Sequence, residues 1–391
     1  MTGVEVVGGD DKIVLNASKE VVLSGGTWCS SVEFENNTLT IYLYYTGALN
    51  SPQLLLLSGI GPKHELEKVG IKPKHDLPGV GKNMQDHLNL AVTCKESTSM
   101  SYGLSLSSVH RWIMSPLQLA FGGKGMLTST FAEGGGFAKT RQDKDIPDIQ
   151  FHFYPSKIKR QMELNSILGH GFSLQTCLLR PKSRGSVTLR DSNPDSKVLI
   201  DPNYLAEEED VQVFVDGFKL MRKILSTAPL KDHVQEEINP GMFECYDSLD
   251  VFQSYHTLSR VICFENITVI SFVSQEKKSL SYQHSNTTTG TDKVQTDEEI
   301  RDFVRDNATT IFHPTGTCRM GPSNDSEAVV DSRLCVHGIQ GLRVADASIM
   351  PEIVGANTNV PAIAIGERAS SFILGTEESE EEYEGQLASS C

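Results

Sequence analysis

Short alternating segments in the middle of the chain constrain its fold more than any other feature. Apolar and polar residues alternate over a few positions in PDIQFHFYP, GFSLQTCLLRP and GSVTLRDS, and Gly, Pro or Asn separates the segments. This spacing favours the strands of an antiparallel sheet. Apolar residues then recur at helical spacing from Val211 to Leu225. The pattern predicts one amphipathic helix packed against that sheet.

The amino-terminal part predicts strands followed by a helix. Residues 13–15 and 21–23 suggest two strands in a hairpin or meander. Ser51 stands where a helix N-cap is expected, with Pro52 at the first helical position, and the helix should end at Gly59.

The carboxy-terminal part predicts two more helices. Thr296 and Glu299 have the spacing of a capping box before an apolar-periodic run, so a helix should begin there and lead towards His313. The segment GLRVADASIMP is typical of a strand followed by a turn. The segment NVPAIAIGERASSFIL predicts a helix with small residues on one face.

Charge and composition exclude several classes of partner. A formal net charge of -15 in 391 residues, without a cluster of Lys and Arg, argues against nucleic acid. Part of the acidity lies in TEESEEEYEGQ, so residues 376–391 are expected to form a disordered acidic tail. No stretch approaches the roughly 18 apolar residues of a transmembrane segment. The eight cysteines show no metal-ligand spacing, so no metal site is expected.

The motif HPTGTCRMG places His313 in a turn near the carboxyl end of the chain. An alcohol that gives up a hydride needs a base for its hydroxyl proton, and the ordinary pKa of imidazole lies near neutral pH. Asn357, in GANTNVP, could hydrogen-bond the same oxygen without competing for the proton. Taken alone, His313 also suits a structural turn, and GANTN also suits an ordinary loop.

Six motifs follow one another in a fixed order: GALNSPQLLLLSGIGP, LPGVGKNMQDH, LRPKSRGSVTLRDSNPDSKVLIDPNYL, HPTGTCRMG, GLRVADASIMP and GANTNVPAIAIGERA. In this order they resemble the glucose–methanol–choline (GMC) family of FAD-dependent oxidoreductases, and most of all its choline dehydrogenase branch. The resemblance implies FAD as the cofactor. It also implies oxidation of the CH–OH group of a small, choline-like alcohol by hydride transfer to flavin N5.

The resemblance further implies roles for individual residues. His313 matches the catalytic base of the family, and Asn357 matches its partner. Asp346 and Ala347 match a turn that approaches the ribityl and pyrophosphate groups of FAD. The helix start under the isoalloxazine, where free backbone N–H groups would meet the ring, is matched by Asn359 and Pro361.

Substrate and acceptor are less closely defined by the resemblance. Glu133, in FAEGGGF, matches a glutamate of the choline branch, where an anion would offset a quaternary ammonium. The same residue also suits an ordinary loop. Either oxygen or a quinone would serve as electron acceptor, and the choline branch suggests a mitochondrial location.

The chain departs from the family pattern on its amino-terminal side. A strand, G-x-G-x-x-G and a helix should bind the pyrophosphate of FAD, and no such ADP-binding motif occurs in this sequence. The parallel sheet should therefore lack central strands and expose apolar edges. Residues 27–46 and 242–290 interrupt family motifs and are predicted to be insertions. An alternative is a truncated, catalytically inactive fragment or pseudoenzyme that does not retain FAD.

The predicted fold combines α/β and α+β parts. An incomplete FAD-binding, Rossmann-like domain is expected from residues 1–90 and 325–375. Residues 91–324 are expected to form an antiparallel-sheet substrate domain of the FAD-linked reductase C-terminal type.

Overall fold

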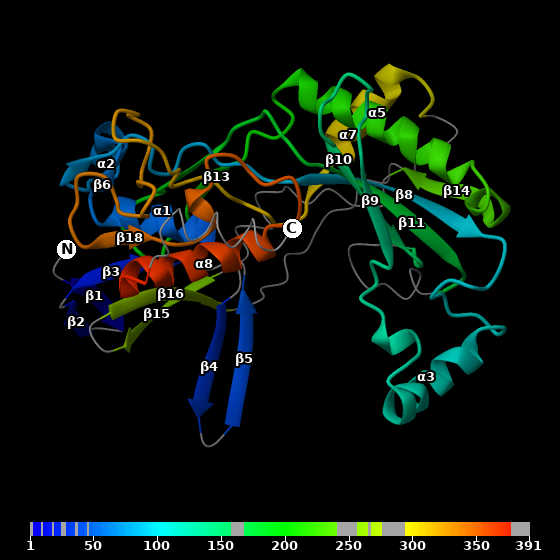
Figure 1. The fold of residues 1–391 in the computed structure, drawn as a ribbon, viewed down its shortest axis with the longest axis horizontal. Helices are drawn as coiled ribbons and strands as arrows, with labels where there is room; N and C mark the ends of the chain where they lie inside the picture. The colour runs from blue at the N-terminus through cyan, green and yellow to red at the C-terminus, as the bar shows by residue number, and fades with distance from the viewer. Residues whose placement is uncertain are drawn as a thin grey trace.

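Two lobes make up the molecule and lie side by side in Figure 1. One lobe contains the first strands and the last helix, and the other contains the middle of the chain around a large sheet. This computed structural model describes residues 3–8, 11–17, 19–24, 29–35, 38–44, 47–157, 168–240, 256–264, 267–275 and 294–376. Apart from Thr376, the predicted acidic tail lies outside the described residues.

A four-stranded sheet forms the centre of the first lobe. Its order is β15 (His256–Phe264), β16 (Ile267–Gln275), β3 (Glu20–Leu23) and β18 (Leu342–Val344). β3 is parallel to both of its neighbours, whereas β15 and β16 form an antiparallel hairpin. The prediction of an exposed apolar edge is wrong on this side of β3, because β16 pairs there. Both hairpin strands fall within residues 242–290, whose origin as an insertion stays a prediction.

Helices α1 (Gly47–Leu57) and α8 (Asn359–Leu374) pack into the core of the first lobe. Leu55 of α1 and Ala369 of α8 share this core with Val21 of β3. α1 begins four residues before the predicted N-cap Ser51. Every residue from Gly47 to Gln53 is buried, so the first turns of the helix lie in the core of the lobe.

The amino-terminal strands pair differently from the prediction. β1 (Gly3–Gly8) and β2 (Asp11–Asn16) form an antiparallel hairpin with each other. The prediction that residues 13–15 and 21–23 share a hairpin or meander is wrong, because β3 pairs with β16 and β18 instead. A second hairpin, β4 (Cys29–Glu35) with β5 (Thr38–Tyr44), falls within residues 27–46.

A six-stranded antiparallel sheet forms the second lobe, and two of the three alternating segments contribute strands to it, as predicted. The third, GSVTLRDS, lies outside this sheet, because its strand over residues 186–188 pairs only with residues 199–201. β8 lies between β14 and β11, β10 lies between β11 and β9, and the short β17 also pairs with β8. The strands are β8 (Leu88–Glu96), β9 (Gly134–Ala138), β10 (Ile149–Tyr154), β11 (Gly171–Leu178), β14 (Val234–Pro240) and β17 (Thr309–Thr310).

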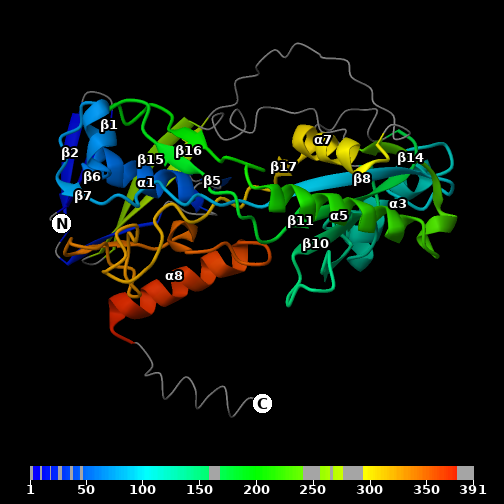
Figure 2. The same cartoon turned by 90° about the horizontal axis from the view of Figure 1, so that it is seen from above.

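Two helices cover one face of this sheet, as Figure 2 shows from above. α5 (Glu208–Leu225) is the predicted amphipathic helix, and its Phe218 is completely buried. The Phe218 ring packs against Phe303 of α7 (Asp297–Asn307) at a centroid distance of 5.7 Å. α7 begins with the predicted capping box of Thr296 and Glu299. The apolar core beneath α5 and α7 is separate from the core of the first lobe.

Short elements complete the described part. α3 (Val109–Gly122) projects from the second lobe and was not predicted from the sequence. Its apolar residues Ile113, Leu117 and Phe121 are exposed. No described helix is long and apolar enough to cross a membrane. The other elements are α2 (Lys63–Lys68), β6 (Ile60–Gly61), β7 (His75–Asp76), β12 (Ser186–Thr188), β13 (Leu199–Asp201), η1 (Met126–Thr128), η2 (Leu230–Asp232) and η4 (Ala347–Ile349).

Candidate active site

The His313 loop, residues 313–317, leads from β17 of the second lobe into the core of the first. Gly316 adopts a φ of 87° and donates its N–H to the Ala347 carbonyl at 3.2 Å. The Thr317 hydroxyl donates to the Ala48 carbonyl at 2.6 Å. These bonds fix the loop on the first lobe, while the His313 side chain remains 9% exposed.

A second segment, the strut, comprises residues 83–87 with the sequence NMQDH and runs beside the His313 loop. Gln85 and Thr315 exchange two backbone hydrogen bonds of 3.0 and 2.8 Å. The Gln85 side-chain amide donates to the Pro351 carbonyl at 3.0 Å and accepts from the Ile353 N–H at 3.1 Å. The strut therefore anchors both the His313 loop and the segment that leads to the GANTN loop.

Asp86 of the strut holds the backbone of His313. Its carboxylate accepts hydrogen bonds from the His313 N–H at 2.8 Å and from the hydroxyls of Thr310 and Tyr204, each at 2.5 Å. Burial raises the pKa of Asp86 to about 6, and these hydrogen bonds act against the rise. No role for Asp86 could be predicted from the sequence, because nothing in NMQDH itself shows which distant groups the carboxylate meets.

The imidazole rings of His87 and His313 meet inside the site. Their Nδ1 atoms are 3.0 Å apart, and the rings are inclined by 76°. Nε2 of His87, which is completely buried, lies 3.2 Å from the Leu179 carbonyl oxygen. Burial lowers the pKa of His87 to about 4, although the Leu179 and Val354 carbonyls favour its charged form. Burial and then the neighbouring His87 and His152 lower the pKa of His313 to about 3. Both rings are neutral at pH 7.

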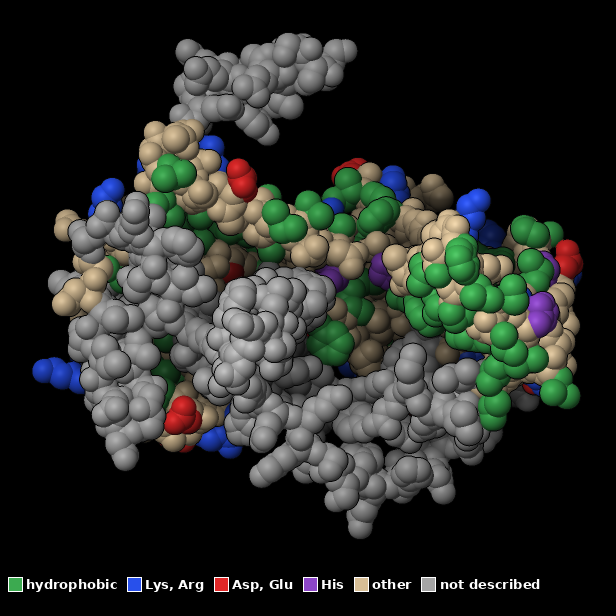
Figure 3. Space-filling model, turned by 90° about the horizontal axis from the view of Figure 1, so that it is seen from below, with side chains coloured by type: hydrophobic (Ala, Val, Ile, Leu, Met, Phe, Trp, Pro, Cys, Tyr) green, Lys and Arg blue, Asp and Glu red, His purple; other side chains and the backbone are tan. Residues whose placement is uncertain are grey.

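His152 of β10 is the third histidine of the site. Ile149 and Phe151 of the same strand belong to the core under α5, so the alternating residue His152 lies on the opposite face of the sheet. It acts electrostatically on His313, and burial lowers its own pKa. Figure 3 shows histidine side chains, in purple, near the middle of the molecule between the lobes.

Acidification should destabilise the protein through this pair. The pKa values of about 4 for His87 and about 3 for His313 lie below the ordinary 6.5, so the folded state binds fewer protons than the unfolded state as pH falls below 6.5. Each histidine then lowers the free energy of unfolding by up to about 1.4 kcal/mol per pH unit. The pKa of Asp86 is raised to about 6, so the folded state binds a proton at this carboxylate before the unfolded state does. Below about pH 6, protonation of Asp86 therefore raises the free energy of unfolding and offsets the effect of one histidine.

Urea unfolding at pH 7 and pH 5 measures this loss of stability. We expect the loss to be smaller in His313→Gln than in the natural chain, because the variant has one fewer buried group that must stay unprotonated. Equal losses in both proteins would show that His313 is not held neutral by the fold.

Substitution of Gly316 should loosen the His313 loop. An added Cβ would lie 2.5 Å from the Asn83 backbone carbonyl oxygen, and the φ of 87° is itself unfavourable for a side chain. Gly316→Ala is therefore expected to lower the free energy of unfolding by about 1–3 kcal/mol. Gly366→Ala in α8, where a Cβ meets nothing within 4 Å, is the control and should be neutral or slightly stabilising. Equal melting temperatures for the two variants would contradict the strained geometry.

The GANTN loop and the start of α8 form an open edge of the site. Asn357 and Asn359 are exposed, and Val360 is 72% exposed. α8 begins without a side-chain cap and without an acidic residue in its first turn. Its first backbone N–H groups and positive dipole end are therefore available to an electron-rich ring. No hydrogen bond joins Asn357 to His313 among the described residues, so their catalytic pairing stays a prediction.

Asp346 and Ala347 lie beneath the His313 loop and are 2% and 0% exposed. Asp346 caps η4 by accepting from the Ser348 N–H at 2.8 Å, and it accepts from the Ser51 hydroxyl at 2.5 Å. Their predicted contact with FAD stays a prediction. The start of α8, where Pro361 is half-buried, offers backbone N–H donors that fit the ring end of FAD. For the pyrophosphate end this sequence has no Gly-rich loop of the expected form.

Glu133 precedes β9 on the exposed surface of the second lobe. Its carboxylate accepts from the Tyr102 hydroxyl, and hydrogen bonds from Ser129 and Tyr102 lower its pKa, so it is ionised at pH 7. Gly135, two residues further, pairs with His152 of β10. No contact joins Glu133 to His313 in the part of the chain described.

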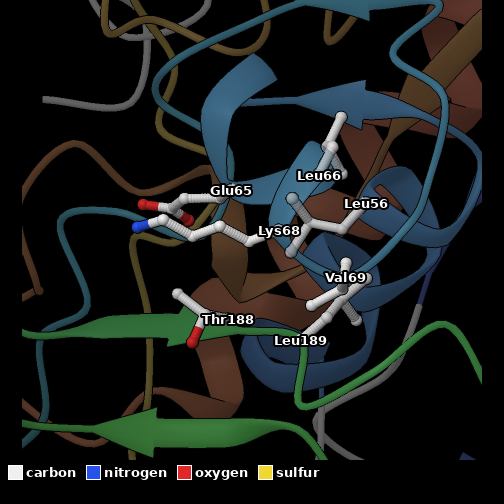
Figure 4. Close-up of a pocket in the computed structure, with 7 residues that line it drawn as sticks. All are labelled: Leu56, Glu65, Leu66, Lys68, Val69, Thr188 and Leu189. Atoms are coloured by element: carbon white, nitrogen blue, oxygen red, sulfur yellow. The ribbon is translucent and has the colours of Figure 1, made fainter.

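A pocket elsewhere in the first lobe contains none of the predicted site residues (Figure 4). It has a volume of about 230 Å³ and is lined by Leu56, Glu65, Leu66, Lys68, Val69, Thr188 and Leu189. Among the described residues, no group of His, Cys, Asp and Glu side chains could hold a metal ion.

Curated proteins with similar sequences are alcohol and choline dehydrogenases. The chain is 38% identical over 328 residues to "Alcohol dehydrogenase [acceptor]" of Pseudomonas putida, covering 84% of this chain and 50% of that protein. It is 33% identical over 379 residues to "Oxygen-dependent choline dehydrogenase" of Brucella ovis, covering 95% of this chain and 55% of that protein. The chain thus spans about half the length of these relatives.

Solved structures with a similar fold include two oxidases. Pyridoxine 4-oxidase from Mesorbium loti matches with a TM-score of 0.64 at 23% identity, covering 96% of this chain and 55% of that one. Formate oxidase matches with a TM-score of 0.67 at 22% identity, covering 96% and 57%. At this level of identity the likeness shows the fold alone, and it confirms the predicted combination of an FAD-binding type of domain with an antiparallel-sheet domain.

Two family models, both described as GMC oxidoreductase, match the chain. One covers residues 11–89 and the other covers residues 181–366. The His313 loop, the strut and the GANTN loop all lie within these matches, and the lobes that carry them have the fold of the solved relatives. The chain belongs to the GMC oxidoreductase family.

Proposed function

We propose that this protein oxidises the CH–OH group of a small alcohol, with FAD as the hydride acceptor and His313 as the base for the hydroxyl proton. The observation that carries the proposal is a nearly buried imidazole, which the strut holds at both its ring and its backbone and whose pKa burial keeps below its usual value. A base that is unprotonated at neutral pH can accept a proton as soon as an alcohol binds.

Each side chain of the site has a distinct task in this proposal. FAD, when bound, supplies the electron sink that takes the hydride from the carbon. His313 holds the alcohol oxygen by a hydrogen bond and then takes its proton. Asn357, which is exposed on the GANTN loop, would donate a second hydrogen bond to the same oxygen. Asp346, Ala347, Asn359 and Pro361 would shape the cofactor site.

The proposed substrate is a choline-like alcohol. Glu133 is an ionised, exposed carboxylate on the lobe that carries His152, and an anion there would attract a quaternary ammonium. A curated relative is named an oxygen-dependent choline dehydrogenase, and oxygen or a quinone would reoxidise the cofactor here. We propose a mitochondrial location from the resemblance of the six motifs to the choline dehydrogenase branch of the family.

One observation favours a second candidate, a catalytically inactive member of the family that does not retain FAD. Both edges of β3 are already paired, with β16 on one side and β18 on the other. A strand that carries a pyrophosphate-binding loop could therefore not pair with β3 unless the β15–β16 hairpin moved.

Flavin retention followed by anaerobic reduction separates the two candidates. The chain is incubated with FAD, freed from unbound FAD on a desalting column, and mixed without oxygen with choline or with an uncharged primary alcohol. The proposal predicts retained flavin absorption that bleaches faster with choline. Colourless protein whose melting temperature FAD does not raise would support the inactive candidate. Retained flavin that bleaches only with the uncharged alcohol would overturn the choline-like substrate and keep the oxidoreductase.

A further inference from the structure

His87 contacts two groups whose chemistry fixes the position of its proton. The Leu179 carbonyl can only accept a hydrogen bond, so Nε2 of His87 must carry the hydrogen across the 3.2 Å distance. A neutral imidazole carries one N–H, which leaves Nδ1 of His87 as an acceptor.

The same logic then determines the tautomer of His313. Nδ1 of His313 lies 3.0 Å from Nδ1 of His87, and since the latter accepts, the former must carry the hydrogen. The lone pair of neutral His313 is therefore on Nε2. The structure has no hydrogen bond to Nε2 of His313 from any described residue. This nitrogen is free to meet a ligand.

We propose that His87 is a positioning residue, which holds His313 in the Nδ1–H tautomer and so presents Nε2 as the proton acceptor. The inference rests on the proposed function for its chemical purpose, but the tautomer itself exists without substrate or cofactor. In the proton-transfer step, the O–H bond of the alcohol breaks and its electron pair stays on oxygen. The proton bonds to Nε2, while the Nδ1–H of His313 remains and keeps donating to neutral His87.

The opposite order of hydrogens is disfavoured by the surroundings of His87. If Nδ1 of His87 donated to His313, the neutral His87 ring would turn a lone pair towards the Leu179 carbonyl oxygen. That arrangement loses a hydrogen bond at a completely buried side chain and places two lone pairs against each other.

The strut divides two tasks between adjacent residues. The carboxylate of Asp86 accepts from the backbone N–H of His313 at 2.8 Å and not from its ring. The ring instead meets the uncharged His87, which stabilises an imidazolium less than a carboxylate would. Asp86 thus places the backbone of the base, and His87 selects which nitrogen acts.

Nitrogen NMR of the full chain, without FAD, tests the tautomer directly. The protein is labelled with ¹⁵N-histidine, and the eleven histidines are recorded at neutral pH by two-bond ¹H–¹⁵N correlation. Loss of signals in His313→Gln and in His87→Asn assigns the two rings. We expect a protonated Nδ1 and an unprotonated Nε2 for His313, and the reverse for His87. A protonated Nε2 on His313, or an average of both tautomers, would overturn the inference.

Two variants of His87 test its causal role. In His87→Asn, the amide oxygen can replace Nδ1 as acceptor, so the His313 tautomer should be kept. In His87→Phe no acceptor remains, and His313 should lose its Nδ1–H preference. An unchanged His313 spectrum in His87→Phe would show that another group selects the tautomer. If His87→Phe does not fold, the tautomers of the natural chain still decide the inference. The NMR measurement does not depend on turnover. Protein that shows the expected tautomers but oxidises no alcohol would therefore contradict the proposed function and leave the inference about His87 intact.

Discussion

Replacement of His313 by glutamine is expected to slow the reduction of bound flavin by an alcohol by about 10²–10⁴-fold, the usual contribution of a positioned general base. Glutamine keeps a polar side chain of similar length but cannot take up the hydroxyl proton. The rate is measured by anaerobic stopped-flow absorbance of FAD-loaded protein. Cofactor affinity should change little, because the proposed task of His313 is towards the alcohol.

His110→Gln is the matched control for this experiment, because His110 is exposed on α3 outside the site. Its reduction rate should equal that of the natural chain. If His313→Gln also reduces flavin at that rate, His313 is not the base.

Replacement of Asp86 by alanine should lower the free energy of unfolding more than Gly316→Ala does. The variant leaves three buried donors without an acceptor, namely the His313 N–H and the hydroxyls of Thr310 and Tyr204. Each orphaned donor costs about 1–3 kcal/mol, so we expect the free energy of unfolding to fall by at least about 3 kcal/mol. The variant also removes a carboxylate that is costly to bury, as its pKa of about 6 indicates. This gain offsets part of the loss from the three orphaned donors.

Asp86→Asn provides the comparison, because an amide keeps one acceptor oxygen at the same position. Its loss in a urea titration should be clearly smaller than that of Asp86→Ala. A change below about 0.5 kcal/mol in Asp86→Ala, which is typical of surface substitutions, would show that the strut does not depend on this carboxylate.

Helices whose stabilisation is local could be predicted from the sequence. The helical period of residues 211–225 and the capping box of Thr296 and Glu299 both correspond to helices of the structure. The start of α1 could not be predicted in the same way. Its first seven residues are all buried, so no polar stripe marks where the helix begins, and Ser51 bonds Asp346 instead of capping the helix.

The turn that carries His313 could be predicted from the sequence, but the contacts that hold it could not. Pro314 and Gly316 predict a non-helical turn there, and the role of His313 as a base stays a prediction. The groups that hold it are 226 and 227 positions away, on His87 and Asp86, and no periodic pattern connects such distant residues. A polar QDH run directly before a buried strand was the available signal. The pairing of β16 with β3 has the same origin in long-range packing.

Titration of FAD into ¹⁵N-histidine-labelled protein tests the central claim most directly, because it reports cofactor binding and its position together. We expect saturable binding that shifts the ring signals of His313 and leaves those of exposed His110 unchanged. Absence of saturable binding, or binding that leaves the His313 signals where they were, would contradict it.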